Sequence, residues 1–388
     1  MLLLLASLVG CDDGSPKVNP EGAPPRKQTV DPDNPDACAE CHANIVAEWK
    51  QSMHAKAHHD SDPIYGGVLA KVKDKLGEDT AKSCARCHNP RDAENPNSPA
   101  GKLGVSCASC HMLDEVHVGQ GKVGVEALVF ADVVRMRAGH DMAEGSSPAH
   151  KTGKAPEFVK DRKTVCLACH DVSSNPSGVT TCATGAEFED RAAKDKGCID
   201  CHMPRIPGPG GEVGSRSEHA RHVFLGPHRA WYFDDAEFLS TAVALKGTLG
   251  PTGLDVTLTN ETGHAFPTGY PGRVAVLQAE GKNAAGEVVW KNIEKDPMTE
   301  SPDSVFNKVY VDAEGNKTMT VFSKSMQRDN RLKPAEARTL KFEVPETVAT
   351  VELKVVMRLV PTGAHDKLGI AGKVESEPRV VTAATVKR

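Results

Sequence analysis

Apolar residues recur at helical spacing shortly after the first two cysteines of the chain's central region. Ile45, Val46, Trp49 and Met53 follow a near-helical period, and residues 43–58 contain neither proline nor glycine. The pattern predicts a helix over 43–58. Such a helix would act as a straight strut, fixing the distance between groups bound near its two ends.

The last third of the chain changes to the period of β-strands. Leu254, Val256 and Leu258 alternate with polar residues, and residues 340–344 alternate in the same way. Further short strands are expected at 274–278, 288–290 and 351–360. Several short strands, separated by turns rich in glycine and asparagine, favour an all-β immunoglobulin-like sandwich domain over residues 236–388.

The N-terminus begins with a short apolar run that ends in Leu8-Val9-Gly10-Cys11. The run is too short to span a membrane and is typical of a signal peptide. Its ending resembles a bacterial lipobox, in which the cysteine is lipidated and becomes the mature N-terminus. An ordinary secretory signal and a buried N-terminal strand are the alternatives.

The lipobox interpretation predicts how the protein is attached. Residues 1–11 would be a lipoprotein signal peptide ending at lipidated Cys11. Residues 12–36, rich in proline, glycine and aspartate, would be a flexible tether. We therefore expect the protein in the periplasm or at the cell surface, lipid-anchored to a bacterial membrane.

Composition indicates an unusual core. The 388 residues include 16 histidines and 12 cysteines, whereas aromatic residues make up only 4 %. A chain so poor in aromatic residues needs either an aliphatic core or flat apolar surface from a bound group. The formal net charge of −5 gives no indication of a nucleic-acid partner.

A Cys-x-x-Cys-His motif occurs five times and accounts for ten of the 12 cysteines. The cysteines are Cys38 and Cys41, Cys84 and Cys87, Cys107 and Cys110, Cys166 and Cys169, and Cys198 and Cys201. The adjacent histidines, which we expect to be the proximal iron ligands, are His42, His88, His111, His170 and His202. Two thiols at this spacing can bond the two vinyl groups of a porphyrin, and the next histidine can then reach the iron.

Two other interpretations of a Cys-x-x-Cys pair are half of a zinc site and a redox dithiol. Five copies, each followed directly by histidine and placed behind an export signal, argue against both. We therefore expect five covalent, thioether-linked haems c in a mostly helical and irregular cytochrome domain over residues 37–235. Of the other two cysteines, Cys11 is explained by the lipobox, and Cys182 is expected to be a buried, inert thiol.

Eleven histidines lie outside the motifs, which is enough to give every iron a second imidazole. Side chains on one straight helix cannot bind one iron from opposite sides, so His54 would serve a neighbouring haem rather than that of His42. The distal candidates are His54, His117, His150, His222, His228 and His264. His58, His59, His140 and His219 are weaker candidates, and Met112 and Met203 point away from the irons of their own motifs. The sequence does not assign individual histidines to individual haems.

The surroundings of these motifs resemble a known family. The segments CAECH…W…SMHA, GVSCASCH, SSPAHK…VCLACHD and GCIDCHMPRIPGPGG…HVFLGPH are similar to multihaem c-type cytochromes related to the tetrahaem electron acceptor of hydroxylamine oxidation. Hydroxylamine oxidoreductase and the multihaem nitrite reductases belong to the same wider group. The segment ETGHAFPTGYPGR, residues 261–273, resembles one whose histidine reaches a haem in some members.

The resemblance implies stacked haems and electron transfer outside the cytoplasm. Two departures matter: five motifs exceed the four of the closest type, and the lysine-ligated motif of the nitrite reductases is absent. The leading interpretation is therefore an electron carrier rather than an enzyme. Its partners would be other cytochromes or a membrane quinol-linked oxidoreductase.

Two alternative functions remain open. One is a multihaem oxidoreductase with a five-coordinate haem, acting on a small nitrogen or sulfur compound. The other is a docking module, formed by the sandwich, with an attached haem relay.

Overall fold

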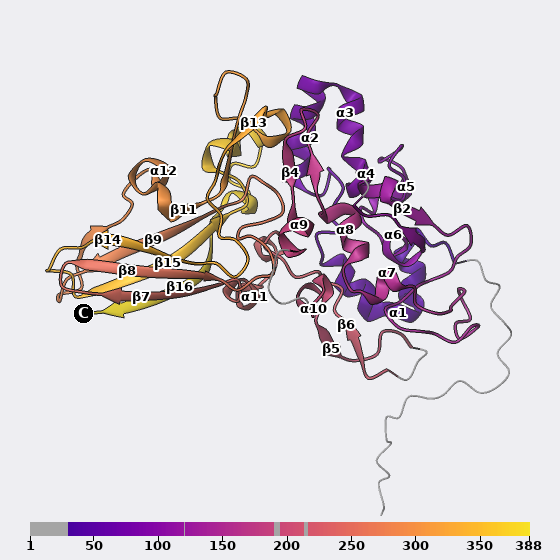
Figure 1. Ribbon diagram of the computed structural model, residues 1–388. Coiled ribbons are helices and arrows are strands. Elements are labelled where there is room, and N and C mark those ends of the chain that lie inside the picture. The colour runs from indigo at the N-terminus through magenta and orange to yellow at the C-terminus, as the bar shows by residue number, and fades with distance from the viewer. Residues whose placement is uncertain (1–29, 120, 190–194, 213–215) are drawn as a thin grey trace, which may run out of the picture.

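The computed structural model describes residues 30–119, 121–189, 195–212 and 216–388. Figure 1 shows a part made of helices and irregular segments beside a part made of longer strands. Cys11, the predicted signal peptide and most of the predicted tether lie outside the described residues. Among the residues that are described, no helix is long and apolar enough to cross a membrane.

The N-terminal part consists of short helices and three small antiparallel strand pairs. Its α-helices are α1 (Pro35–Lys50), α2 (Pro63–Leu76), α3 (Glu78–Ser83), α4 (Ala85–His88), α5 (Pro99–Lys102), α6 (Cys107–His111), α7 (Glu157–Lys160), α8 (Thr164–His170), α9 (Thr184–Glu189), α10 (Cys198–His202) and α11 (Ala236–Ser240). Its 3-10 helices are η1 (Gly124–Ala127) and η2 (Arg229–Trp231). The strand pairs are β1 (Leu113–Val116) with β2 (Leu128–Phe130), β3 (Ser173–Ser174) with β4 (Thr180–Cys182), and β5 (Arg205–Pro207) with β6 (Glu218–Ala220).

The helix α1 differs from the predicted helix over 43–58 at both ends. It begins inside the predicted tether, where the side chain of Asn34 caps it by accepting from the amide of Asp36. It ends at Lys50, and the hydroxyl of Ser52 then accepts from a later amide in a turn. His54 therefore lies beyond the helix, and the expectation of one straight strut was wrong.

The C-terminal part is dominated by strands. These are β7 (Val243–Leu249), β8 (Gly253–Asn260), β9 (Val274–Lys282), β10 (Val288–Lys291), β11 (Val305–Phe306), β12 (Lys308–Val311), β13 (Ser325–Asp329), β14 (Ala337–Glu343), β15 (Thr350–Arg358) and β16 (Arg379–Lys387). Short helices connect them: α12 (Pro297–Glu300), α13 (His365–Leu368), η3 (Pro302–Ser304), η4 (Thr320–Phe322), η5 (Thr362–Ala364) and η6 (Val374–Ser376). Strands occur at all five places where alternation or short apolar runs predicted them.

The strands form two principal antiparallel sheets. One has the order β14-β8-β7, and the other has the order β10-β9-β15-β16, with β11 also paired to β9. A separate pair joins β12 to β13. This arrangement agrees with the expectation of many short antiparallel strands.

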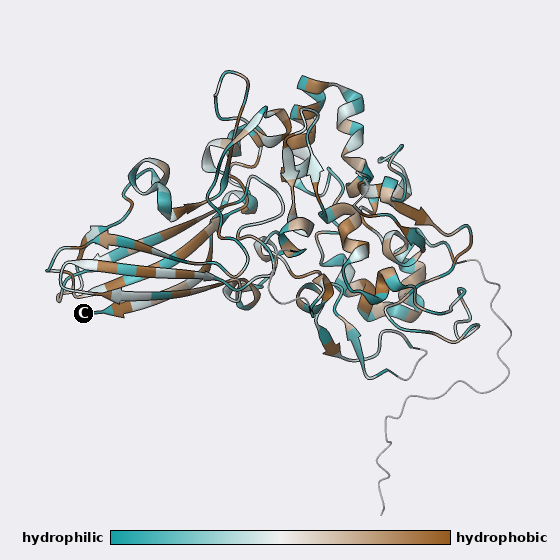
Figure 2. Ribbon diagram, viewed as in Figure 1, coloured by the Kyte–Doolittle hydropathy of each residue, from teal (hydrophilic) through white to brown (hydrophobic). Residues whose placement is uncertain are grey.

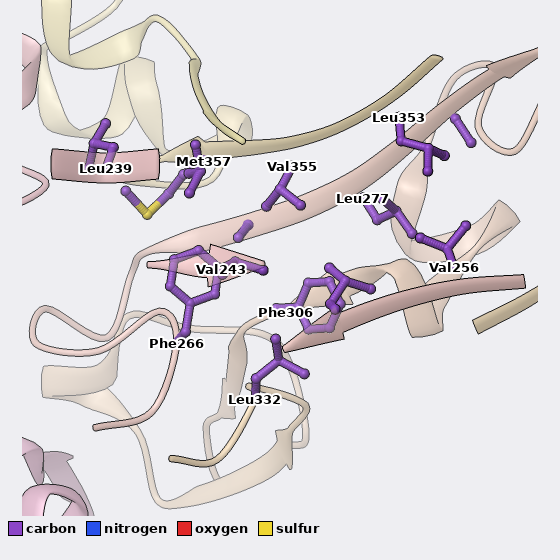
Figure 3. Packing of buried hydrophobic residues seen from close by; sticks show 14 of the residues in the cluster. Leu239, Val243, Val256, Phe266, Leu277, Phe306, Leu332, Leu353, Val355 and Met357 are labelled. Atoms are coloured by element: carbon purple, nitrogen blue, oxygen red, sulfur yellow. The ribbon is translucent and has the colours of Figure 1, made fainter. Parts of the chain in front are cut away.

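The alternation along the strands creates the main hydrophobic core. Leu254, Val256 and Leu258 of β8 have no exposed surface, while the residues between them are partly exposed. Side chains from the second sheet, among them Leu277 and Leu353, belong to the same cluster. Figure 2 shows the alternation of apolar and polar residues, and Figure 3 shows the packed side chains. Each such side chain contributes about 1.5–3 kcal/mol on burial.

This core continues into the helical part, because Ile64 and Trp231 belong to the same cluster. The indole of Trp231 also donates a hydrogen bond of 2.8 Å to the carbonyl of Glu377. At a second contact, the amide of Asn175 donates to the carbonyls of Thr320 and Ser323 at 2.8 and 2.9 Å. The two parts are therefore joined by apolar packing as well as by hydrogen bonds.

Candidate haem-binding sites

Each of the five motifs forms a helical turn: four lie within α1, α6, α8 and α10, and the second consists of α4 and the preceding Cys84. A helical turn brings two cysteines three positions apart to the same face and leaves the next side chain free to turn under it. Nine of the ten motif cysteines are partly buried, and Cys201 is exposed. Each site is named below after the histidine of its motif.

Backbone carbonyls orient four of the motif histidines. The Nδ1 atoms of His42 and His111 lie 2.5 Å from the carbonyls of Gly210 and Arg137, and His88 makes the same contact at 3.0 Å. His202 makes it with the carbonyl of Leu225. Since a carbonyl can only accept, Nδ1 carries the proton, and Nε2 keeps the lone pair that a metal requires.

Four motif histidines each face a second imidazole. The pairs and the distances between their ring centres are His42 and His150 at 6.4 Å, His111 and His222 at 6.1 Å, His170 and His54 at 6.2 Å, and His202 and His264 at 6.2 Å. Two metal–nitrogen bonds of about 2 Å on opposite sides of one iron, with about 1 Å from each nitrogen to its ring centre, require roughly 6 Å. These four pairs fit a six-coordinate haem iron.

The electrostatics of the facing histidines favour the neutral form that binds metals. Burial lowers the pKa of His54 to about 3 and those of His222 and His264 to about 4, and it lowers the pKa of His150 as well. A depressed pKa keeps the imidazole unprotonated at neutral pH, so its lone pair remains available.

His54 is held close to its partner by a tight turn. Its carbonyl accepts from the amide of Val105 at 3.0 Å. Gly104 has a φ of +68°, and a Cβ atom at this position would lie 2.5 Å from the carbonyl oxygen of His54. Only glycine fits there without a shift of the backbone. The ring of Phe224 packs edge-on against His54 at 4.2 Å.

His264 reaches its partner from the β-sheet part of the chain. It lies in the loop between β8 and β9, and its carbonyl accepts from the side-chain amide of Asn260 at 2.8 Å. Glu187 of α9 accepts from the amide of Ala265 at 3.3 Å and from the hydroxyl of Thr268. The loop is thus anchored to the helical part on the side where His202 lies.

His88 differs from the other four motif histidines. No imidazole of the described residues faces it at the separation of the other pairs; instead the ring of Tyr65 stacks on it at 3.8 Å. His88 interacts through charge with Asp62 and with His228. The Nδ1 atom of His228 lies 3.8 Å from a carboxylate oxygen of Asp62. Burial lowers the pKa of His228 to about 3, and its Nε2 atom has no hydrogen-bond partner.

The remaining histidine candidates do not face a motif histidine among the described pairs. The Nε2 atom of His117 lies 3.1 Å from a carboxylate oxygen of Glu115. His219 contacts Glu48 at 3.0 Å, and Glu48 also accepts from the backbone amide of His222 at 2.7 Å. Glu48 therefore positions a facing histidine, a role that no pattern in the sequence indicated.

The other weaker candidates have surroundings of their own. His58 is buried, its Nδ1 atom lies 3.5 Å from a carboxylate oxygen of Asp60, and its ring is tilted against that of His59 with 4.0 Å between the ring centres. The pKa of His140 is lowered mainly by burial and further by the positive charges of Arg216 and Arg205. Cys182 is partly buried and lies 3.6 Å from the hydroxyl of Thr184.

Cysteines of different motifs lie in contact. The hydrogen-bonded thiol pairs are Cys38 with Cys107, Cys87 with Cys169, and Cys166 with Cys198. The charge of Cys110 also acts on Cys166 and Cys169. These contacts join the His42 site to the His111 site and the His170 site to the His88 and His202 sites, and the charge of Cys110 links the two groups.

Comparisons with known proteins agree with this geometry. A model of the family described as cytochrome c554 and c-prime matches residues 37–112. The crystal structure of a penta-haem cytochrome c552 from Thermochromatium tepidum is similar over 90 % of this chain and 97 % of its own, with 26 % identity and a TM-score of 0.75. None of the curated proteins matches the chain. These similarities support a multihaem c-type cytochrome with an electron-transfer function.

Proposed function

We propose that the protein is an extracytoplasmic electron carrier with five covalently bound haems c, most of them ligated by two histidines. The observation that carries this proposal is the set of four facing imidazole pairs at 6.1–6.4 Å between ring centres. Haem iron, when bound, supplies one-electron oxidation and reduction. The protein's own residues attach the group, ligate it from both sides and shield it from water.

The closeness of thiols from different motifs supports electron transfer between the haem attachment sites. Cysteines of neighbouring motifs touch, so the attachment sites adjoin one another rather than standing apart. The His170 site, in contact with the His88 and His202 sites and linked to the His111 site by charge, is the junction of the set. Partners that exchange electrons with it would be other cytochromes or a membrane quinol-linked oxidoreductase.

The number of haems is tested by the mass of the mature protein. It should exceed the mass of the polypeptide by five haem masses, and a smaller excess would refute the number. Replacing Cys84 and Cys87 together with alanine should remove one haem mass and leave the other four. A Cys182→Ala variant is the matched control, because Cys182 belongs to no motif, and it should keep all five.

A second function, an oxidoreductase acting on a small nitrogen or sulfur compound, is favoured by the surroundings of His88. No facing imidazole is present there among the described residues, while Asp62, His228 and a Tyr232–Glu375 hydrogen bond lie in the same buried region. Electron paramagnetic resonance of the oxidised protein separates the two functions. Only low-spin signals favour the carrier, whereas one high-spin haem favours the enzyme.

The location and the wider classification belong to the same proposal. A lipid anchor at Cys11 is tested by Cys11→Ser, which should release the protein from the membrane fraction in soluble form; a variant that stays membrane-bound would refute the anchor.

The motif surroundings support a relationship to the acceptor of hydroxylamine oxidation. The two antiparallel sheets around one core support an immunoglobulin-like sandwich.

A further inference from the structure

Arg273 ends the loop that carries His264 and directly precedes β9. Its guanidinium donates a hydrogen bond of 2.7 Å to the carbonyl of Thr268. A Cβ atom at Gly269 would lie 2.8 Å from the same guanidinium, so the glycine leaves room for it. The side chain is therefore held in one place by the fold of its own loop.

The guanidinium lies among the candidate haem sites. Burial is the main reason that the pKa values of His170, His202 and His264 are low, and the positive charge of Arg273 lowers all three further. Two of these histidines belong to motifs, and the third faces one of them. Arg273 is thus close enough to both the His170 site and the His202 site for its charge to act on their histidines.

Arg273 has no counter-ion among the described residues, since none of their carboxylates lies within 4 Å of its nitrogens. Arg331, in contrast, pairs with Glu187 at 2.7 Å and with Asp329 at 2.8 Å. Burial lowers the pKa of Arg273 to about 10, although its side chain keeps some accessible surface. A largely buried guanidinium without a counter-ion favours binding an anion, and its planar fork suits a carboxylate.

We propose that Arg273 binds a propionate carboxylate of a haem attached at the His170 or the His202 site, and that it raises the potential of that haem. The inference rests on the haem attachment proposed above. Reduction adds a negative charge to the iron, so a fixed positive charge nearby favours the reduced state. Arg273 is a positioning residue in this role and takes no part in electron exchange itself.

The test uses the full-length, haem-loaded protein and an Arg273→Gln variant in a potentiometric titration followed by absorption spectroscopy. One or two haems should become at least tenfold harder to reduce, which is about 59 mV for one electron. Their potentials should also begin to depend on pH, because a propionate without its partner titrates. Arg273→Lys should restore most of the parent potential, because it keeps the charge.

The control is Arg328→Gln, which removes an arginine on β13 whose hydrogen bond goes to the carbonyl of Pro302. It should leave every potential unchanged. If Arg273→Gln retains five haems by mass and all five parent potentials, the inference is wrong while the proposed function stands. If the parent potentials respond to added acetate and the variant's do not, a free anion is the occupant, and the propionate assignment is overturned.

Discussion

Replacing His264 with alanine tests the histidine pair, His202 and His264, whose members come from the two parts of the molecule. Burial lowers the pKa of His264 from 6.5 to about 4, which corresponds to roughly 3 kcal/mol in favour of the neutral imidazole. Because the pKa is depressed, proton binding in the folded protein begins only as the pH approaches 4. His264 should therefore remain a ligand at pH 5, where an exposed histidine is largely protonated.

The assay is electron paramagnetic resonance and absorption of the oxidised, haem-loaded protein at pH 7 and pH 5. The parent should show the same number of low-spin haems at both values. His264→Ala should convert one further haem to high spin at both, because His202 then has no facing imidazole. His264→Met should keep that haem low-spin and raise its potential, since thioether ligation has this effect.

A matched control is His117→Ala, which removes a histidine that pairs with Glu115 rather than facing a motif histidine. Its spectra should equal those of the parent. If His264→Ala keeps every low-spin signal of the parent, the 6.2 Å separation from His202 does not reflect shared iron. If the parent itself gains a high-spin haem between pH 7 and pH 5, the argument from burial fails.

Two further predictions concern stability. Leu353→Ala should lower the free energy of unfolding by about 2–5 kcal/mol, because Leu353 has no exposed surface. Urea melts followed by circular dichroism measure this change. As a control, Val380→Ala at an exposed position should change the free energy of unfolding by less than about 0.5 kcal/mol. Burial raises the pKa of Asp62, so its contribution favours folding at low pH and is lost as the pH rises through the raised value. Asp62→Asn keeps an acceptor for the amides of Ile64 and Tyr65 at the start of α2. The melting temperature of this variant, relative to that of the parent, should rise between pH 4 and pH 8. A difference in melting temperature that is constant with pH would contradict this.

The sequence predicted the strands better than the helix. Alternation at 254–259 follows directly from a sheet with one buried face, so β8 was found within a residue or two. The apolar period over 43–58 carries no information about the hydrogen bond to Ser52 that follows α1, so the end of that helix was missed. A single polar contact can form a turn that ends a helix, even where a weak apolar period continues along the sequence.

The motif residues and a set of distal candidates could be named from the sequence, whereas the pairing of individual histidines could not. Each facing histidine comes from a distant segment, as with His150 for His42, and only the folded chain brings the two together. The stacking of Tyr65 on His88 and the support of His222 by Glu48 have no signature in the sequence. Both depend on tertiary packing, which spacing along the chain does not encode.

The contacts between cysteines of different motifs also constrain the biogenesis of the protein. Cys87 and Cys169, for example, are close enough to hydrogen bond although they belong to separate motifs. In an oxidising compartment, neighbouring thiols can be joined in a disulfide, and such a bond would take one cysteine from each of two motifs. If haems are attached as proposed above, each would have to be bound while its two thiols are still reduced and apart from the thiols of the neighbouring motif.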